Sequence, residues 1–130
     1  MNDTDARPVL RTLFVEDNAE LREQIGELLA EEGLVVVGCD SAEAALQRYA
    51  AERFDLVVTD VSLPQMSGVD LARAILRAQP NTWVVFLSGY AFGHELASFG
   101  PHVRALLKPF ELDDLQALIE EIRACAASRV

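Results

Sequence analysis

Short apolar runs alternate with longer segments in which apolar residues recur at every third or fourth position. The runs are residues 13–15, 34–37, 56–58, 83–87 and 103–107. Each run is nearly continuous in apolar residues, which predicts a strand buried on both faces, as in a parallel sheet. Because a helical segment follows every run, the sequence predicts a (βα) unit repeated five times.

Apolar residues at helical spacing mark the expected helices. They are Leu21, Ile25, Leu28 and Leu29 in the first, Ala42, Ala45, Leu46 and Tyr49 in the second, Leu71, Ala74, Ile75 and Ala78 in the third, Phe92, Leu96 and Phe99 in a short fourth, and Leu112, Leu115, Leu118, Ile119 and Ile122 in the fifth. Gly33, Pro80 and Gly100 stand where the first, third and fourth should end. Right-handed crossovers place helices on both faces of a sheet, so we expect an α/β fold with a doubly wound five-stranded parallel sheet.

The pattern occupies nearly all of the 130 residues and leaves no room for a second domain. We expect one domain over residues 9–126, an N-terminal tail over residues 1–8 and a C-terminal tail over residues 127–130. Hydrophobic residues make up 51% of the chain and charged residues 25%, which is a composition that fills a globular core.

The formal net charge of −10 opposes binding to the phosphates of nucleic acid or to an anionic membrane surface. No segment approaches the roughly 18 consecutive apolar residues of a membrane-spanning helix, and the polar N-terminus lacks a signal-peptide pattern. Cys39 and Cys125 form neither a disulfide framework nor a zinc pattern. We therefore expect a cytoplasmic protein without a direct nucleic-acid or membrane partner.

Chemically active side chains follow four of the expected strands. Glu16 and Asp17 follow the first, Asp60 the third, Ser88 the fourth and Lys108 the fifth. In open sheets of this kind, ligands bind outside the carboxyl ends of the strands. We therefore expect these side chains to share one cleft.

Three carboxylates in one cleft repel one another unless a cation lies among them. Oxygen ligands suit Mg²⁺, whereas the chain has too few cysteines and histidines at suitable spacing for zinc. Asp60 stands alone at its strand end and could act as a nucleophile that forms an aspartyl phosphate. Lys108 would then neutralise phosphoryl oxygens, and Ser88 would hydrogen-bond one of them.

Four motifs carry a resemblance to a known family. They are VEDN at 15–18, TDVSLPQMSG at 59–68, LSGY at 87–90 and LLKPF at 106–110. In these motifs, and over about residues 9–126, the chain resembles response regulator receiver domains, the phospho-accepting modules of two-component signalling. The resemblance implies a flavodoxin-like fold with strand order 2-1-3-4-5 and a cis peptide between Lys108 and Pro109.

The resemblance also implies a role for each site residue. Asp60 would be the phosphorylated aspartate, and Ser88 and Lys108 would contact the phosphoryl group. Mg²⁺ would be held by Glu16, Asp17, Asp60 and the backbone carbonyl of Ser62. The implied partners are a sensor histidine kinase or phosphotransfer protein and a downstream protein target. Such a protein is not an enzyme, although it assists its own phosphorylation and dephosphorylation.

Two features depart from the family pattern. Ala105 stands three residues before the lysine, where family members commonly carry tyrosine or phenylalanine. The segment between Ser88 and Lys108 is also shorter than usual, as in stand-alone receivers and in receivers attached to sensor kinases. Both features leave the usual conformational switch of the family in question.

Other interpretations differ in what they require. Glu16, Asp17 and Asn18 precede a helix and could be N-terminal acids and a cap. An aspartate-nucleophile phosphatase would need an acid where Ser62 stands, and a nucleotide or flavin binder would need a phosphate-binding loop in place of Glu16 and Asp17. The strongest rival is a receiver-fold interaction module that works without phosphorylation.

Overall fold

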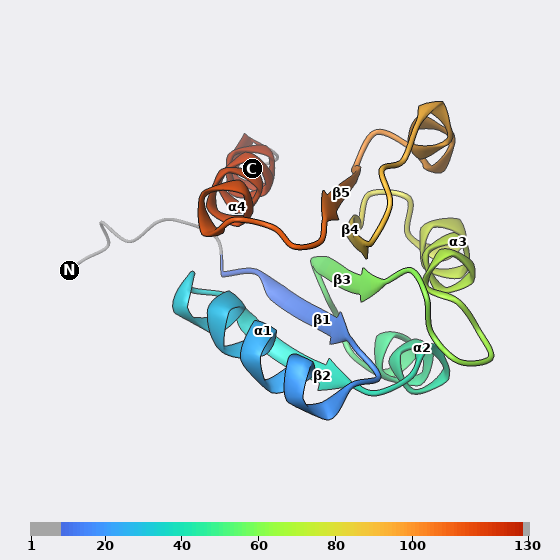
Figure 1. Ribbon diagram of the computed structural model, residues 1–130. Coiled ribbons are helices and arrows are strands. Elements are labelled where there is room, and N and C mark those ends of the chain that lie inside the picture. The colour runs from blue at the N-terminus through green and yellow to red at the C-terminus, as the bar shows by residue number, and fades with distance from the viewer. Residues whose placement is uncertain (1–8, 129–130) are drawn as a thin grey trace.

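The computed structural model describes residues 9–128, and its centre is a five-stranded parallel sheet (Figure 1). The strands are β1 (Arg11–Val15), β2 (Val35–Cys39), β3 (Leu56–Asp60), β4 (Trp83–Ser88) and β5 (Val103–Leu107). They pair in the order β2-β1-β3-β4-β5, which confirms the predicted fold class and strand order. The expected tail at residues 1–8, and residues 129–130 of the expected C-terminal tail, lie outside the described residues.

Helices cover both faces of the sheet, as Figure 1 shows. They are α1 (Ala19–Glu31), α2 (Ala42–Ala51), α3 (Gly68–Ala78), a short 3₁₀ helix η1 (His94–Phe99) and α4 (Leu112–Ser128). Apolar residues of α1 and α4 pack on one face, and those of α2, α3 and η1 pack on the other. The expected short fourth helix is therefore a 3₁₀ helix. No helix in the described part of the chain has the length and apolarity needed to cross a bilayer.

The core lies around the three central strands. Every residue of β3 and β4 is buried, and so are the residues of β1 after Arg11. The prediction of burial on both faces was wrong for β2 and β5, where Val35 is 45% and Leu107 is 52% exposed. These two strands form the edges of the sheet, and edge strands are less completely covered by the helices.

Side-chain caps begin the helices that flank the strand ends. Oδ1 of Asn18 accepts a hydrogen bond from the N–H of Leu21 at the start of α1, and the hydroxyl of Ser67 accepts one from the N–H of Asp70 at the start of α3. Gly33, with φ of +89°, follows the end of α1, as the sequence predicted. The caps fix where each helix starts, and they thereby fix the short turns that follow β1 and β3.

Candidate functional site

The turn between β1 and α1 carries Glu16 and Asp17. Glu16 is 1% exposed, and its Oε2 accepts a hydrogen bond from the N–H of Asn18 at 3.0 Å. Nη1 of Arg22, one turn into α1, donates to the backbone carbonyl of Glu16 at 2.8 Å. Asn18 is thus a helix cap, as the simpler interpretation held, but the burial of Glu16 sets it apart from an ordinary exposed acid at a helix end.

Asp60 is the last residue of β3 and is 7% exposed. The loop after it folds back, so that the N–H of Gly68 donates to the carbonyl of Val61 at 3.0 Å. A Cβ at residue 68 would lie 1.9 Å from the backbone carbonyl oxygen of Asp60, which is far inside van der Waals contact. Only glycine allows the start of α3 to approach the acid so closely.

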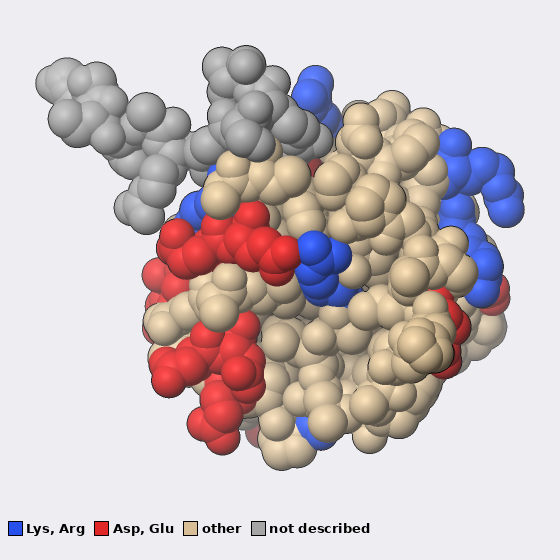
Figure 2. Space-filling view, turned by 90° about the horizontal axis from the view of Figure 1, so that it is seen from above, with Lys and Arg blue, Asp and Glu red and all other residues tan. Residues whose placement is uncertain are grey.

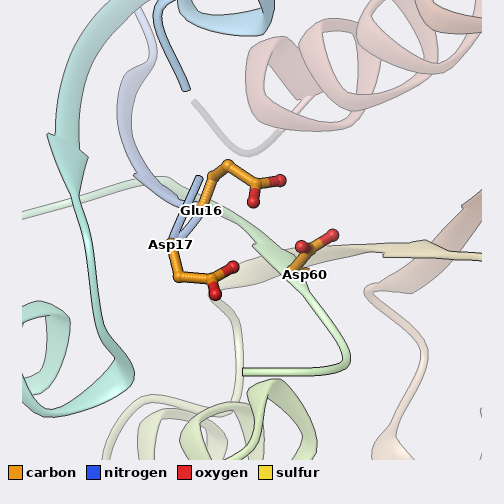
Figure 3. Close-up of side chains that lie close together, drawn as sticks. All are labelled: Glu16, Asp17 and Asp60. Carbon is orange, nitrogen blue, oxygen red and sulfur yellow. The ribbon is translucent and has the colours of Figure 1, made fainter. Parts of the chain in front are cut away.

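The three predicted acids come together at the carboxyl ends of the strands. Figure 3 shows Glu16 and Asp17 reaching from the end of β1 toward Asp60 at the end of β3. One carboxylate oxygen from each residue lies within 4.8 Å of the other two. The cluster has an exposed side, because Asp17 is exposed while the other two are buried.

Lys108 joins this cluster from the far side of β4. Its Nζ lies 2.5 Å from Oδ1 of Asp60 and 3.9 Å from Oε1 of Glu16. The backbone N–H of Lys108 donates to the carbonyl of Ser88 at 2.7 Å, which ties the end of β5 to the end of β4. The peptide bond between Lys108 and Pro109 is cis, as the resemblance implied.

Ser88 is the last residue of β4 and is 2% exposed. Its hydroxyl donates to the carbonyl of Tyr90 at 2.6 Å and accepts from the N–H of Tyr90 at 3.0 Å. Ser88 thus lies at the carboxyl ends of the strands, as predicted, but its hydroxyl is hydrogen-bonded to the loop that follows it.

Burial raises the pKa of Glu16 from an ordinary value of 4.5 to about 7. The N–H of Asn18 opposes this shift, because it hydrogen-bonds the ionised form. The nearby carboxyl of Asp60 adds to the shift, and the ammonium of Lys108 lowers the pKa. Glu16 therefore binds its proton more tightly than an ordinary glutamate, mainly because its side chain is buried and to a smaller extent because Asp60 lies beside it.

The donor set fits a hard divalent cation. Glu16, Asp17 and Asp60 each offer carboxylate oxygens, which Mg²⁺ prefers to nitrogen or sulfur ligands. Oε1 of Glu16 is buried and accepts no hydrogen bond from the described residues, so a cation would satisfy it. Ser62 is exposed in the loop after β3, and the ligand role of its carbonyl stays a prediction.

Two contributors to the site were not assigned a role from the sequence. Arg22 holds the backbone of Glu16, and the backbone of Tyr90 holds the hydroxyl of Ser88. Both contacts use main-chain atoms. Neither composition nor residue spacing reveals them, because every residue carries the same main-chain groups.

Comparisons with a family model and with individual known proteins point to the same family. Residues 12–120 match the family described as the response regulator receiver domain. The chain is 32% identical over 118 residues to the response regulator receiver protein CpdR of Brucella abortus, with 89% of this chain and 98% of CpdR covered. It is 36% identical over 111 residues to the response regulator protein FleR of Pseudomonas aeruginosa, but spans only 24% of that longer protein.

Solved structures share the same fold. A receiver domain protein from Clostridium thermocellum superimposes with a TM-score of 0.82 at 23% identity, covering 94% of this chain and 100% of that one. The response regulator protein TrrA of Thermotoga maritima, solved in complex with Mg²⁺ and BeF, gives 0.78 at 25% identity, covering 88% of this chain and 99% of TrrA. By its fold and its match over residues 12–120, the chain belongs to the response regulator receiver domain family of two-component signalling.

Proposed function

We propose that this receiver domain is a phosphorylation-dependent switch that accepts a phosphoryl group on Asp60. The observation that carries the proposal is the setting of this one carboxylate. Asp60 is 7% exposed, lies beside two other acids, and has the ammonium of Lys108 at 2.5 Å. A nearly buried acid with both a metal-binding neighbourhood and a cationic partner is suited to receive a phosphoryl group.

The donor is a phosphohistidine on a sensor histidine kinase or phosphotransfer protein. A carboxylate oxygen of Asp60 forms a bond to phosphorus, and the bond between phosphorus and the imidazole nitrogen breaks. The electron pair of that bond returns to the imidazole, which leaves as the neutral ring after protonation. The chain itself is not an enzyme in this scheme, although its residues assist its own phosphorylation and dephosphorylation.

The other site residues support the charge that the phosphoryl group brings. Glu16, Asp17, Asp60 and the backbone carbonyl of Ser62 would hold Mg²⁺, which would supply positive charge next to the phosphoryl oxygens. Lys108, already in contact with Asp60, pairs with another phosphoryl oxygen. The hydroxyl of Ser88 leaves the carbonyl of Tyr90 and donates to a phosphoryl oxygen.

The output is a contact with a downstream protein. The net charge of −10 opposes direct binding to nucleic acid or an anionic membrane. Figure 2 shows most of the acidic side chains of the face that it presents on one side, a smaller group at the opposite edge, and mainly uncharged residues between them. A surface of this kind suits a protein partner, and a cytoplasmic location follows from a partnership with the kinase domains of two-component systems.

A small phosphodonor such as phosphoramidate, with Mg²⁺, tests the proposal directly. We expect the intact mass of the protein to rise by one phosphoryl group, and Asp60→Asn to abolish the rise. The matched control is Asp70→Asn, because Asp70 is an exposed acid in the first turn of α3. An undiminished rise in Asp60→Asn would overturn the assignment of the acceptor.

The alternative function, an interaction module that works without phosphorylation, has its own signature. Ala105 is the observation that favours it, because it departs from the family pattern beside an otherwise complete site. A module of this kind would bind its partner equally well with and without beryllofluoride, which imitates the phosphoryl group. A switch would change its partner affinity on adding beryllofluoride and Mg²⁺.

A further inference from the structure

The loop after β4 is attached to the rest of the molecule at two points. Gly89, Tyr90 and Ala91 are exposed, with Tyr90 52% exposed. The first attachment is the pair of hydrogen bonds between the hydroxyl of Ser88 and the backbone of Tyr90. The second is the ring of Phe92, which is partly buried and packs against the core on the face of the sheet that α2, α3 and η1 cover.

The ring of Phe92 rests on the centre of the sheet. It stacks on Phe86 of β4, with ring centroids 5.2 Å apart and planes inclined by 22°. The partner of Phe86 on β5 is Ala105, whose small side chain packs against the same core. Phe92 and Phe99 fill this part of the core from the loop and from η1. Phe92 thereby anchors the loop on the same strand that ends in Ser88.

The hydroxyl of Ser88 has a single proton, which it donates to the carbonyl of Tyr90. It can donate to a phosphoryl oxygen on Asp60 only by giving up that bond. The turn and the phosphoryl group therefore compete for one donor. The more firmly the loop is anchored, the smaller the fraction of molecules in which the hydroxyl is available, and the weaker the apparent binding of a phosphoryl group.

We propose that Phe92 is a positioning residue for Ser88: by stacking on Phe86 it holds the turn in which Tyr90 retains the Ser88 hydroxyl, and so sets how readily that hydroxyl turns to the acceptor site. This inference rests on the proposed function, since it concerns the same phosphoryl site. The loop after β4 thus controls the availability of the Ser88 hydroxyl, a role for which the side chain of Ala105 is too small.

Isothermal titration calorimetry with beryllofluoride, in saturating Mg²⁺, tests this role. Phe92→Ala should bind beryllofluoride more tightly than the parent, by about threefold to tenfold, the range that one lost hydrogen bond of ordinary net strength spans. Its affinity for Mg²⁺ alone should stay unchanged, because the acids are untouched. Hydrogen exchange at the Tyr90 amide should be faster in Phe92→Ala without any ligand.

The matched control is Phe99→Ala. Phe99 contacts the same Phe86 ring, at 5.3 Å between centroids, but it belongs to η1 and not to the loop that carries Tyr90. Phe99→Ala removes comparable core packing and should leave beryllofluoride affinity at the parent value. Phe92→Leu provides a milder variant if Phe92→Ala does not fold, and it should shift the affinity in the same direction by less.

A double-mutant cycle separates the positioning role from simple core packing. Ser88→Ala should weaken beryllofluoride binding, and Phe92→Ala should have no further effect in that background. Equal affinities in the parent and Phe92→Ala, an equal gain in Phe99→Ala, or a gain that persists in Ser88→Ala would each overturn the inference. A parent protein that binds Mg²⁺ but no beryllofluoride would instead overturn the proposed function itself.

Discussion

The ammonium of Lys108 reaches past β4 and lies 2.5 Å from Oδ1 of Asp60, the acid at the end of β3. It also lies 3.9 Å from Oε1 of Glu16. A cation that belongs to the chain therefore already stands among the acids. Lys108 stabilises two carboxylates that would otherwise repel each other, and it adds positive charge next to the place where a metal would bind.

Removing this ammonium should make the site bind Mg²⁺ more tightly. In Lys108→Met, the metal no longer meets a positive charge beside Asp60, so the dissociation constant of Mg²⁺ measured by calorimetry should fall severalfold. The metal-free variant should also be less stable in urea than the parent. Arg77→Met, which removes an exposed cation from the end of α3, is the control and should leave Mg²⁺ affinity as it is. An unchanged affinity in Lys108→Met would contradict the prediction.

The raised pKa of Glu16 predicts a pH dependence of stability without metal. The pKa is about 7 in the folded state and near 4.5 in the unfolded chain, so the folded state binds the proton more tightly. The contribution of Glu16 should therefore lower the free energy of unfolding as pH rises from about 4.5 to about 7, by up to about 3 kcal/mol. The loss should be complete about one pH unit above 7, where Glu16 is ionised in both the folded and the unfolded state.

Urea unfolding in EDTA at pH 5 and pH 7.5 checks this sign, with Glu16→Gln as the comparison. The amide of the variant does not titrate, so the stability difference between variant and parent should grow in favour of the variant as pH rises. Glu27→Gln, at an exposed position on α1, should show no such trend. If the free energies of unfolding of Glu16→Gln and the parent changed in parallel with pH, the ionisation of Glu16 would not destabilise the fold, and the prediction would be wrong.

Binding of Mg²⁺ should stabilise the folded protein through the acidic cluster. At about one hundred times its dissociation constant, a ligand of the folded state alone raises the free energy of unfolding by about 2.7 kcal/mol. Asp17→Asn should lose most of this gain, and its metal-free melting temperature should equal or exceed that of the parent because repulsion is relieved. Glu20→Gln, an exposed acid in the first turn of α1, should keep the full gain. If millimolar Mg²⁺ left the melting temperature of the parent unchanged, the prediction that the acidic cluster binds Mg²⁺ would be wrong.

Two glycine substitutions should have opposite effects on stability. Gly68→Ala places a Cβ 1.9 Å from the carbonyl oxygen of Asp60, so we expect a loss of about 3 kcal/mol or more and a disturbed acceptor site. Gly26→Ala, inside α1, meets no atom within 4 Å and should stabilise the protein by about 0.5–1 kcal/mol. Chemical denaturation measures both. A well-folded Gly68→Ala with parent stability would show that the start of α3 moves freely.

The sequence predicted the elements well where periodicity has a direct physical cause. Strand β5 was predicted at its observed bounds, and β4 with one residue fewer, because their apolar runs are uninterrupted. Exposure was predicted less well. Leu21 and Leu112 fit the helical stripes, yet they are 39% and 48% exposed in the first turns of their helices. The strand order came only from the family resemblance, because local patterns do not encode which strands become neighbours.

The acidic cluster could be predicted because parallel strands end at a common edge, which brings Glu16, Asp17 and Asp60 together. The direct contact of Lys108 with Asp60 follows the same logic. The engagement of the Ser88 hydroxyl by Tyr90 could not be predicted, since it depends on the path of the backbone after β4. For the same reason the sequence gave no sign of the close approach of Gly68 to Asp60.

The acidic cluster joins the ends of β1 and β3, and its lysine arrives from beyond β5, so no local segment contains the site. A growing or partly unfolded chain can form α1 or α2 from nearby residues, whereas parallel strand pairing requires the closure of long stretches of chain. The three acids and Lys108 therefore come together only when β1, β3 and β5 have taken their places in the sheet. Under the proposed function, a nascent or partly unfolded copy of this protein could not accept a phosphoryl group, because only folding brings these side chains together.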